Sequence, residues 1–292
     1  MQTALVDPAT NARSLADRAR QAEDDGDTAR ARQLLEQARR ADPDNAEINR
    51  QLAQVLLSEG KADAALAALG DSLTRDPGDH RGRFLLAGIL VDRGELDRAN
   101  AVLDEALSID PQALDVLLLK GRIAEIEQQD GLALECYHRA VGVEPENIIA
   151  RLRIAELQIK AERPDRAAPI LRSICQSNQA SCDQLASARW QLGIVYGRER
   201  RWEEAATELA AAIQTRPTTH ADDWYRVAYA HRMAGNDGAA SASLQRALEL
   251  DPAHPAALAL ATALEPERNF VSHTDIQPAR FVLAGAPPPA GW

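Results

Sequence analysis

The sequence predicts an all-α fold made of repeated pairs of antiparallel helices, and three observations lead to this prediction. The first is composition, because aromatic residues make up only 4% of the 292 residues. Alanine, the best helix former, supplies about a fifth of them, whereas a large β-sheet core is usually filled by aromatic and β-branched side chains. The other two observations are a proline that returns at a fixed interval and a pair of residues that returns in step with it.

Prolines mark the place where each helix pair ends. A proline cannot continue a helix, and it moves the residue before it out of the helical region. The first four of these prolines are 34 residues apart and the last two are 35 residues apart. They occur in Asp42-Pro43, Asp76-Pro77, Asp110-Pro111 and Glu144-Pro145, and then at Pro217 and in Asp251-Pro252.

A small residue and a large residue recur four positions apart in the second helix of every pair. Residues with this spacing share one helix face, and the small residue lets two helices approach closely while the large one fills the groove. The small residues are Ala31, Ala65, Ala99, Ala133, Ala167, Ala205 and Ala240. The large residues are Leu35, Leu69, Leu103, Tyr137, Leu171, Leu209 and Leu244.

The helix pairs follow one another in order, and turns divide the two helices of a pair. Gly26, Gly60, Gly94 and Gly235 lie at these turns, where glycine suits the left-handed residue that ends a helix. The fifth unit has lost its proline and carries an insertion around residues 177–183. The units are expected near residues 12–45, 46–79, 80–113, 114–147, 148–185, 186–220 and 221–254, followed by a capping helix at 255–265 that Pro266 stops.

The first helices carry a signature of their own, which is most complete in the sixth and seventh units. It consists of Arg189, Leu192, Gly193 and Tyr196 in one unit and of Trp224, Val227, Ala228 and His231 in the other. With the alanine, the large residue and the proline, this pattern resembles the tetratricopeptide repeat family over about residues 12 to 254. The resemblance implies a right-handed superhelical α-solenoid over residues 12–265, after a lead-in at residues 1–11.

The resemblance also implies a function, because in this family the first helices line a concave groove that binds other proteins. We therefore expect a non-catalytic scaffold that binds a peptide or a helical segment of a partner protein. Aromatic and arginine side chains are the usual anchors of an interface, and the alternative is that some of them only pack against the neighbouring helix. The candidate groove residues are Phe84, Leu118, Arg122, Leu152, Arg153, Trp190, Arg198, Tyr225, Arg226, Tyr229 and Arg232.

The sequence shows no pattern of an active site, a metal site or a cofactor site, and no cofactor is expected. It contains no Gly-rich phosphate loop, nucleophile elbow or HExxH motif. The net charge of −11 opposes nucleic-acid binding, which depends on neutralising phosphates. Cys175 and Cys182 flank the insertion; they could form a disulfide in an exported protein and would be reduced in the cytoplasm.

The last segment, residues 266–292, is a Pro-rich tail or linker that also carries apolar side chains such as Phe270, Phe281 and Trp292. Three alternatives stay open: it leads to a further domain, it folds back on the last helices, or the groove of another copy captures it. The chain could accordingly be the recognition arm of a larger bacterial enzyme or envelope-assembly complex. No membrane-spanning segment is expected, and the compartment is cytoplasmic if Met1 is the native start and periplasmic if a signal peptide was removed.

Overall fold

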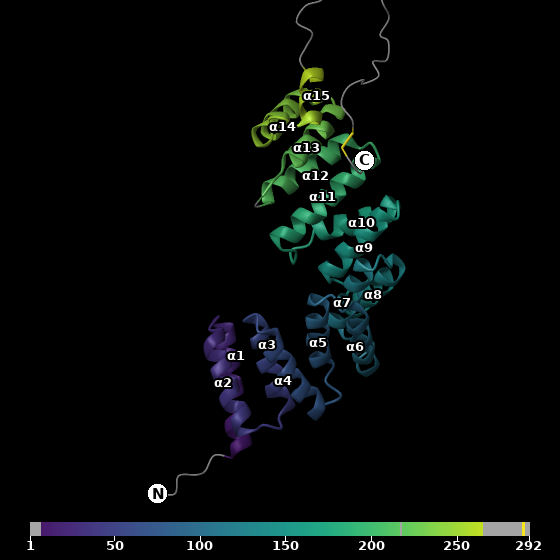
Figure 1. Cartoon of the computed structure of the whole chain (residues 1–292). Helices are drawn as coiled ribbons and strands as arrows, with labels where there is room; N and C mark the ends of the chain where they lie inside the picture. The colour runs from purple at the N-terminus through teal and green to yellow at the C-terminus, as the bar shows by residue number, and fades with distance from the viewer. Residues whose placement is uncertain (1–6, 217, 265–287, 290–292) are drawn as a thin grey trace, which may run out of the picture. The chain divides into compact units, whose positions relative to one another are not determined.

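The computed structural model describes residues 7–216, 218–264 and 288–289, and within these ranges it contains fifteen α-helices and no β-strand (Figure 1). The chain divides into two compact units, Met1–Pro145 and Glu146–Trp292. Unit 1 contains α1 (Pro8–Asp24), α2 (Thr28–Ala41), α3 (Ala46–Ser58), α4 (Ala62–Arg75), α5 (His80–Asp92), α6 (Leu96–Ile109), α7 (Leu114–Ile126) and α8 (Asp130–Val143). Unit 2 contains α9 (Ile148–Lys160), α10 (Pro164–Cys175), α11 (Cys182–Arg198), α12 (Trp202–Thr215), α13 (Ala221–Met233), α14 (Asp237–Leu250) and α15 (Pro255–Leu264).

Two helices begin earlier than the sequence pattern predicts, and local capping explains both. The first starts at Pro8 instead of near residue 12, because the Asp7 carboxylate accepts a hydrogen bond from the Thr10 amide and a proline is favoured at the first helical position. Helix α11 starts at Cys182 instead of near residue 186. Ser181 and Gln184 form a reciprocal capping box there, with backbone-to-side-chain distances of 3.0 and 3.2 Å.

The turns inside the helix pairs share one backbone conformation but not one residue type. Gly26, Gly60, Gly94 and Gly235 have φ between 74° and 78°, which is the left-handed region that glycine adopts without steric cost. In three other units the corresponding left-handed residue is Gln128, Glu162 or Arg200, with φ between 58° and 60°. Glycine in the sequence therefore identifies only some of the turns between paired helices.

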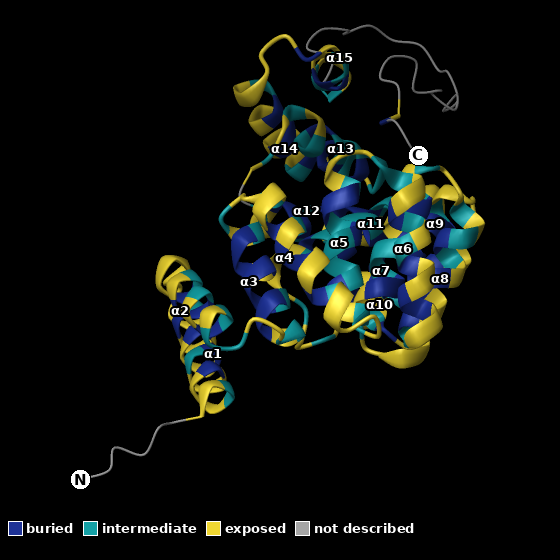
Figure 2. Cartoon of the chain, turned by 60° about the horizontal axis from the view of Figure 1, so that its bottom comes forward, coloured by how far each residue is buried: buried dark blue, intermediate teal, exposed yellow. Residues whose placement is uncertain are grey.

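In unit 1 the two helices of each pair pack through their small residues. The side chains of Ala31, Ala65, Ala99 and Ala133 are fully buried, and Figure 2 shows buried residues on the helix sides that face one another and exposed residues on the outer sides. Gly121 on α7 marks the closest contact, because a Cβ atom there would lie 2.7 Å from the ring of Tyr137. The small and large residues that recur in the sequence thus form the core of each helix pair.

Unit 2 repeats this packing with one further close contact. A Cβ atom at Gly193 on α11 would lie 2.6 Å from Cγ of Leu209 on α12, so this glycine is required by the approach of the two helices. At the end of the unit, α15 packs against α14 and α13 through Ala257 and Leu260, which are buried. Leu258 on the other side of α15 is 44% exposed.

Candidate functional site

The surface formed by the first helices of unit 1 contains a cavity of about 410 Å³. It lies where the N-terminal halves of α5 and α7 meet the middle of α3. Its apolar part includes Phe84, Leu85 and Leu114, and its polar part includes Arg50, Gln54, His80, Arg81 and Asp110. Volumes of about 300–1,000 Å³ are typical of sites that accept a ligand or an anchoring side chain.

The charged residues around this cavity differ in how far they are available to a partner. Arg50 is only 11% exposed and forms ion pairs with Glu47 and, at 3.3 Å, with Asp79, so its charge is already neutralised within the chain. His80 lies 3.8 Å from Asp110 at the rim. Arg81 is exposed and has no ion pair with another described residue, which leaves it available for an acidic partner.

Three sequence-predicted groove residues lie in unit 1, and the structure brings one of them into the cavity. Phe84 lines it and is half-buried. Leu118 lies one turn after Leu114 on α7 and is also half-buried, whereas Arg122 is exposed and likewise makes no ion pair within the described ranges. Neither Leu118 nor Arg122 belongs to the cavity lining.

Sequence reasoning missed His80, Asp110 and Leu114 as parts of this site. The family pattern assigns the groove to positions along the first helices, whereas the cavity extends into the loop before α7 and the first turns of α5 and α7. The Asp-Pro dipeptide at Asp110 was recognisable as a helix end. That it borders a cavity depends on the neighbouring helix, which the dipeptide does not encode.

In unit 2 the predicted anchor Trp190 is covered by two arginine side chains. The guanidinium carbon of Arg216 lies 4.4 Å from the centre of the indole ring, and that of Arg226 lies 5.8 Å from it. Arg216 also lies 3.7 Å from Asp223. Burial lowers the pKa of Arg226. These stacked cations stabilise Trp190 within the chain and leave it half-buried.

The structure corrects the expectation for Tyr225, which the sequence suggested as an exposed anchor. Its side chain is only 3% exposed, and its ring packs 5.4 Å from His254 and 6.3 Å from Tyr229. Burial, with a smaller contribution from Tyr229, raises the pKa of the Tyr225 hydroxyl to about 12. Tyr225 is therefore a core residue at the contact with the capping helix. Tyr229 remains half-buried and forms an edge contact with Trp202 at 6.0 Å.

The remaining predicted residues of unit 2 make contacts inside the chain. Leu152 is 8% exposed and belongs to the core. Arg153 pairs with Glu156 at 2.7 Å, and Arg232 pairs with Asp237 at 2.7 Å. Arg198 donates a hydrogen bond to the backbone carbonyl of Ile159 at 3.1 Å. To bind the carboxylates of a partner, these arginines would first have to break these internal contacts.

The cysteines of the described part of the chain are free thiols that differ in burial. Cys136, Cys175 and Cys182 are free, so the disulfide considered from the sequence is not formed in the structure. Burial raises the pKa of the Cys175 thiol to about 11, which keeps it protonated and unreactive. In the same ranges no group of three His, Cys, Asp or Glu residues is placed to hold a metal ion. No described helix is both long and apolar enough to cross a membrane.

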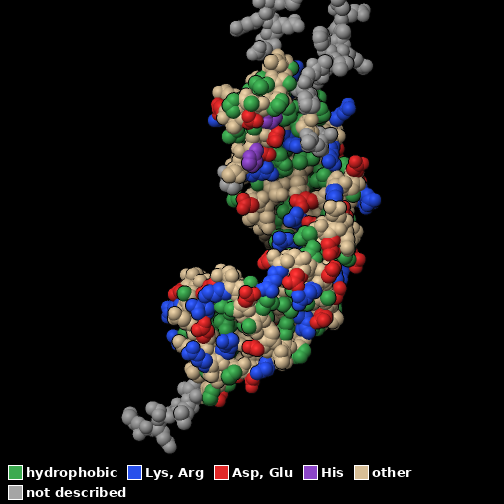
Figure 3. Space-filling model, viewed as in Figure 1, with side chains coloured by type: hydrophobic (Ala, Val, Ile, Leu, Met, Phe, Trp, Pro, Cys, Tyr) green, Lys and Arg blue, Asp and Glu red, His purple; other side chains and the backbone are tan. Residues whose placement is uncertain are grey.

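Charges of both signs are mixed over the face of the molecule that Figure 3 shows. Figure 3 shows lysine and arginine side chains interspersed with aspartate and glutamate over the visible face of unit 1. Mixed charges of this kind are typical of solvent-exposed helix faces.

Comparison with known proteins identifies the repeat type. Family models described as tetratricopeptide repeat match residues 22–69 and 56–123, and another of the same description matches residues 190–255. Together they cover more than half of the chain. No curated protein matches the sequence.

Several solved structures share the fold. YrrB, described as a tetratricopeptide repeat protein with an unusual peptide-binding site, is 25% identical, with a TM-score of 0.57 over 67% of this chain and 98% of its own. A tetratricopeptide repeat protein of Parabacteroides merdae is 16% identical, with a TM-score of 0.56 over 87% of this chain and 98% of its own. The pilF protein of Pseudomonas aeruginosa is 17% identical, with a TM-score of 0.60 over 71% and 92% of the two chains. The helix pairs, their small-residue contacts and these matches agree, and the chain belongs to the tetratricopeptide repeat family, whose repeats generally serve as protein–protein interaction scaffolds.

Proposed function

We propose that this chain is a non-catalytic scaffold that binds a segment of a partner protein in the unit 1 cavity. The observation that carries the proposal is the cavity of about 410 Å³ on the first-helix surface, where apolar and charged side chains meet. Phe84 and Leu85 provide apolar contact, and Arg81 provides a cation that no described residue neutralises. The YrrB structure, which shares this fold, is described as having a peptide-binding site.

The chemistry of the cavity indicates what kind of segment it would accept. An apolar side chain of the partner would pack against Phe84, and an adjacent aspartate or glutamate would pair with Arg81. Half-buried aromatic residues are typical hot spots of interfaces because they bury a large area at a small entropic cost. Leu118 and Arg122 on α7 would extend the contact along the first helices of unit 1. Trp190 and Tyr229 are the corresponding half-buried aromatic residues of unit 2.

A peptide-library selection tests the proposal and does not require that the partner be identified first. Peptides selected on the full chain by phage display would be measured by fluorescence anisotropy against the wild type and Phe84→Ser. We expect Phe84→Ser to raise the Kd at least about tenfold, which is the size of a hot-spot loss. The matched control is Val143→Ser, because Val143 is 39% exposed at the end of a second helix of the same unit. Circular dichroism would verify that both variants are folded.

A charge variant makes the test more specific. Arg81→Glu should weaken the binding of peptides that carry aspartate or glutamate and should leave the affinity for neutral peptides unchanged. The affinity of the wild type for the acidic peptides should fall with added salt. Equal affinities for wild type and Phe84→Ser, or an equal loss in Val143→Ser, would contradict the assignment of the site.

A further inference from the structure

The end of the repeat array has an apolar surface that a second helix covers in the other units. At the eighth position of a unit, Ala53, Ala155 and Ala228 are fully buried under the second helix of their own pair. The equivalent residue of α15, 34 residues after Ala228, is Thr262, and it is exposed. Leu258, one turn earlier, is 44% exposed. Helix α15 therefore corresponds to the first helix of a unit. The described residues contain no second helix that pairs with it.

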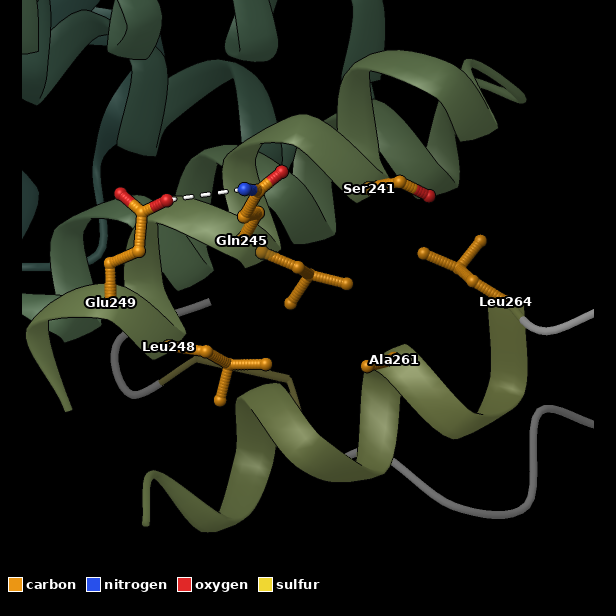
Figure 4. Close-up of a pocket in the computed structure, with 7 residues that line it drawn as sticks. Ser241, Gln245, Leu248, Glu249, Ala261 and Leu264 are labelled. Carbon is orange, nitrogen blue, oxygen red and sulfur yellow. Dashed lines mark hydrogen bonds between the residues drawn. The ribbon is translucent and has the colours of Figure 1, made fainter. Parts of the chain in front are cut away.

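A cavity of about 590 Å³ lies beside this surface, between α14 and α15 (Figure 4). Figure 4 shows Leu248 of α14 and Ala261 and Leu264 of α15 directed into the space between the two helices. Leu244 also lines it, while Gln245 and Glu249 are bonded to each other at 3.2 Å on its α14 side. Leucine and alanine side chains thus supply most of the lining, Gln245 and Glu249 are paired with each other, and the remaining polar side chain is that of Ser241.

We propose that residues Phe270 and Val271 of the same chain occupy this cavity. Leu264, the last described residue of α15, forms part of the cavity wall, so the chain leaves the helix at the edge of the cavity. Phe270 follows six residues later, and six extended residues span about 20 Å. The segment is therefore long enough to turn back into the cavity and too short to reach far beyond it.

The composition of residues 265–292 supports the proposal that this segment fills the cavity. Two of the three phenylalanines of the whole chain, Phe270 and Phe281, are in this segment, each followed by a valine. Prolines at 266, 278 and 287–289 oppose one continuous helix over this segment. A short apolar piece between two prolines can nevertheless cover the exposed apolar side chains.

The course of the chain also favours its own segment over that of a second copy. Pro289, which lies near the far end of this segment, is buried. A short tether gives an effective concentration of about millimolar, which exceeds that of a second copy in a micromolar solution.

The test uses the full chain with the double substitution Phe270→Ser/Val271→Ser and hydrogen–deuterium exchange. We expect amides of α14 and α15 to exchange about tenfold faster in this variant, because local opening is easier where an apolar contact is lost. Amides of α3 to α6 serve as the internal reference and should not change. Phe281→Ser/Val282→Ser is the matched control, since it alters the same residue pair of the same tail outside the proposed contact.

Photo-crosslinking distinguishes the possible occupants. A benzophenone amino acid at position 270 should link to α14 or α15 within one chain. A covalent dimer would mean that the tail of a second copy fills the cavity, and it would overturn the proposal. Unchanged exchange in Phe270→Ser/Val271→Ser, or faster exchange only in Phe281→Ser/Val282→Ser, would overturn it as well. None of these results depends on a partner bound in the unit 1 cavity.

Discussion

Replacing Gly121 with alanine should destabilise unit 1, although alanine is the better helix former. Gly121 lies in α7, and a Cβ atom there would be 2.7 Å from Cε1 and 2.8 Å from Cζ of Tyr137. Tyr137 is 1% exposed and lies in the middle of α8. A buried ring cannot swing away as the end of a flexible side chain could, so the two helices would have to separate.

The size of the effect follows from two opposing contributions. Overpacking a core in this way lowers the free energy of unfolding by about 1–3 kcal/mol. The higher helix propensity of alanine offsets about 0.8–1 kcal/mol of this loss. The expected net loss in the free energy of unfolding is therefore about 1 kcal/mol. Gly70 is the matched control, because it lies in the interior of α4 of the same unit, where a Cβ atom would meet nothing within 4 Å. Gly70→Ala should stabilise the protein by about 0.5–1 kcal/mol.

Urea unfolding followed by circular dichroism measures both variants against the wild type. The two should differ by about 2 kcal/mol, which corresponds to a difference in Tm of about 4 °C or more. A double variant, Gly121→Ala/Tyr137→Leu, restores the alanine–leucine combination that other pairs use, such as Ala53 with Leu69. It should be less destabilised than the sum of its two single changes. A Gly121→Ala protein as stable as Gly70→Ala would refute the packing argument.

Three further predictions concern single buried groups. Ser72→Ala should cost about 1 kcal/mol in urea unfolding, because the buried Ser72 hydroxyl donates a 2.8 Å hydrogen bond to the first carbonyl of α3, and this bond between α4 and α3 would be lost. Burial lowers the pKa of His231 below 6.5, so the unfolded chain binds the proton more tightly, and the free energy of unfolding should fall as the pH drops below about 6.5. His231→Gln should reduce this dependence in acid titrations, and an unchanged dependence would contradict the assignment to His231. At pH 8 a thiol reagent should modify exposed Cys182 at least about tenfold faster than Cys175, whose pKa is raised to about 11 by burial; equal rates would mean that Cys175 is not protected.

The helix pairs could be predicted because their signals are local. The proline at the end of a unit and the alanine–leucine pair four residues apart act within one helix or across one pair. The same signals failed at the start of α11, where Ser181 and Gln184 cap the helix before the repeat pattern begins. They also missed the turns at Gln128, Glu162 and Arg200, because there a residue other than glycine adopts the left-handed conformation.

The candidate site was predictable only in part, because position within a helix does not decide exposure. Phe84 and Tyr225 occupy comparable positions in their units, as residues of a first helix on the side assigned to the groove. Phe84 lines an open cavity, whereas Tyr225 is covered by His254 and the capping helix. The difference arises from the next unit along the chain, which brings a loop and α7 beside Phe84 and a histidine ring onto Tyr225.

The sequence by itself determined the repeat type, the order of the helix pairs and the small residues at their contacts. It could do so because each of these features depends on residues within about 34 positions of one another. Only the tertiary structure decided which side chains remain open to a partner. Exposure depends on the contact of one pair with the next, so Arg81 has no ion pair with a described residue whereas Arg50 on α3 is bound by Asp79, which precedes α5. The same contacts place one cavity beside Phe84 and another between α14 and α15.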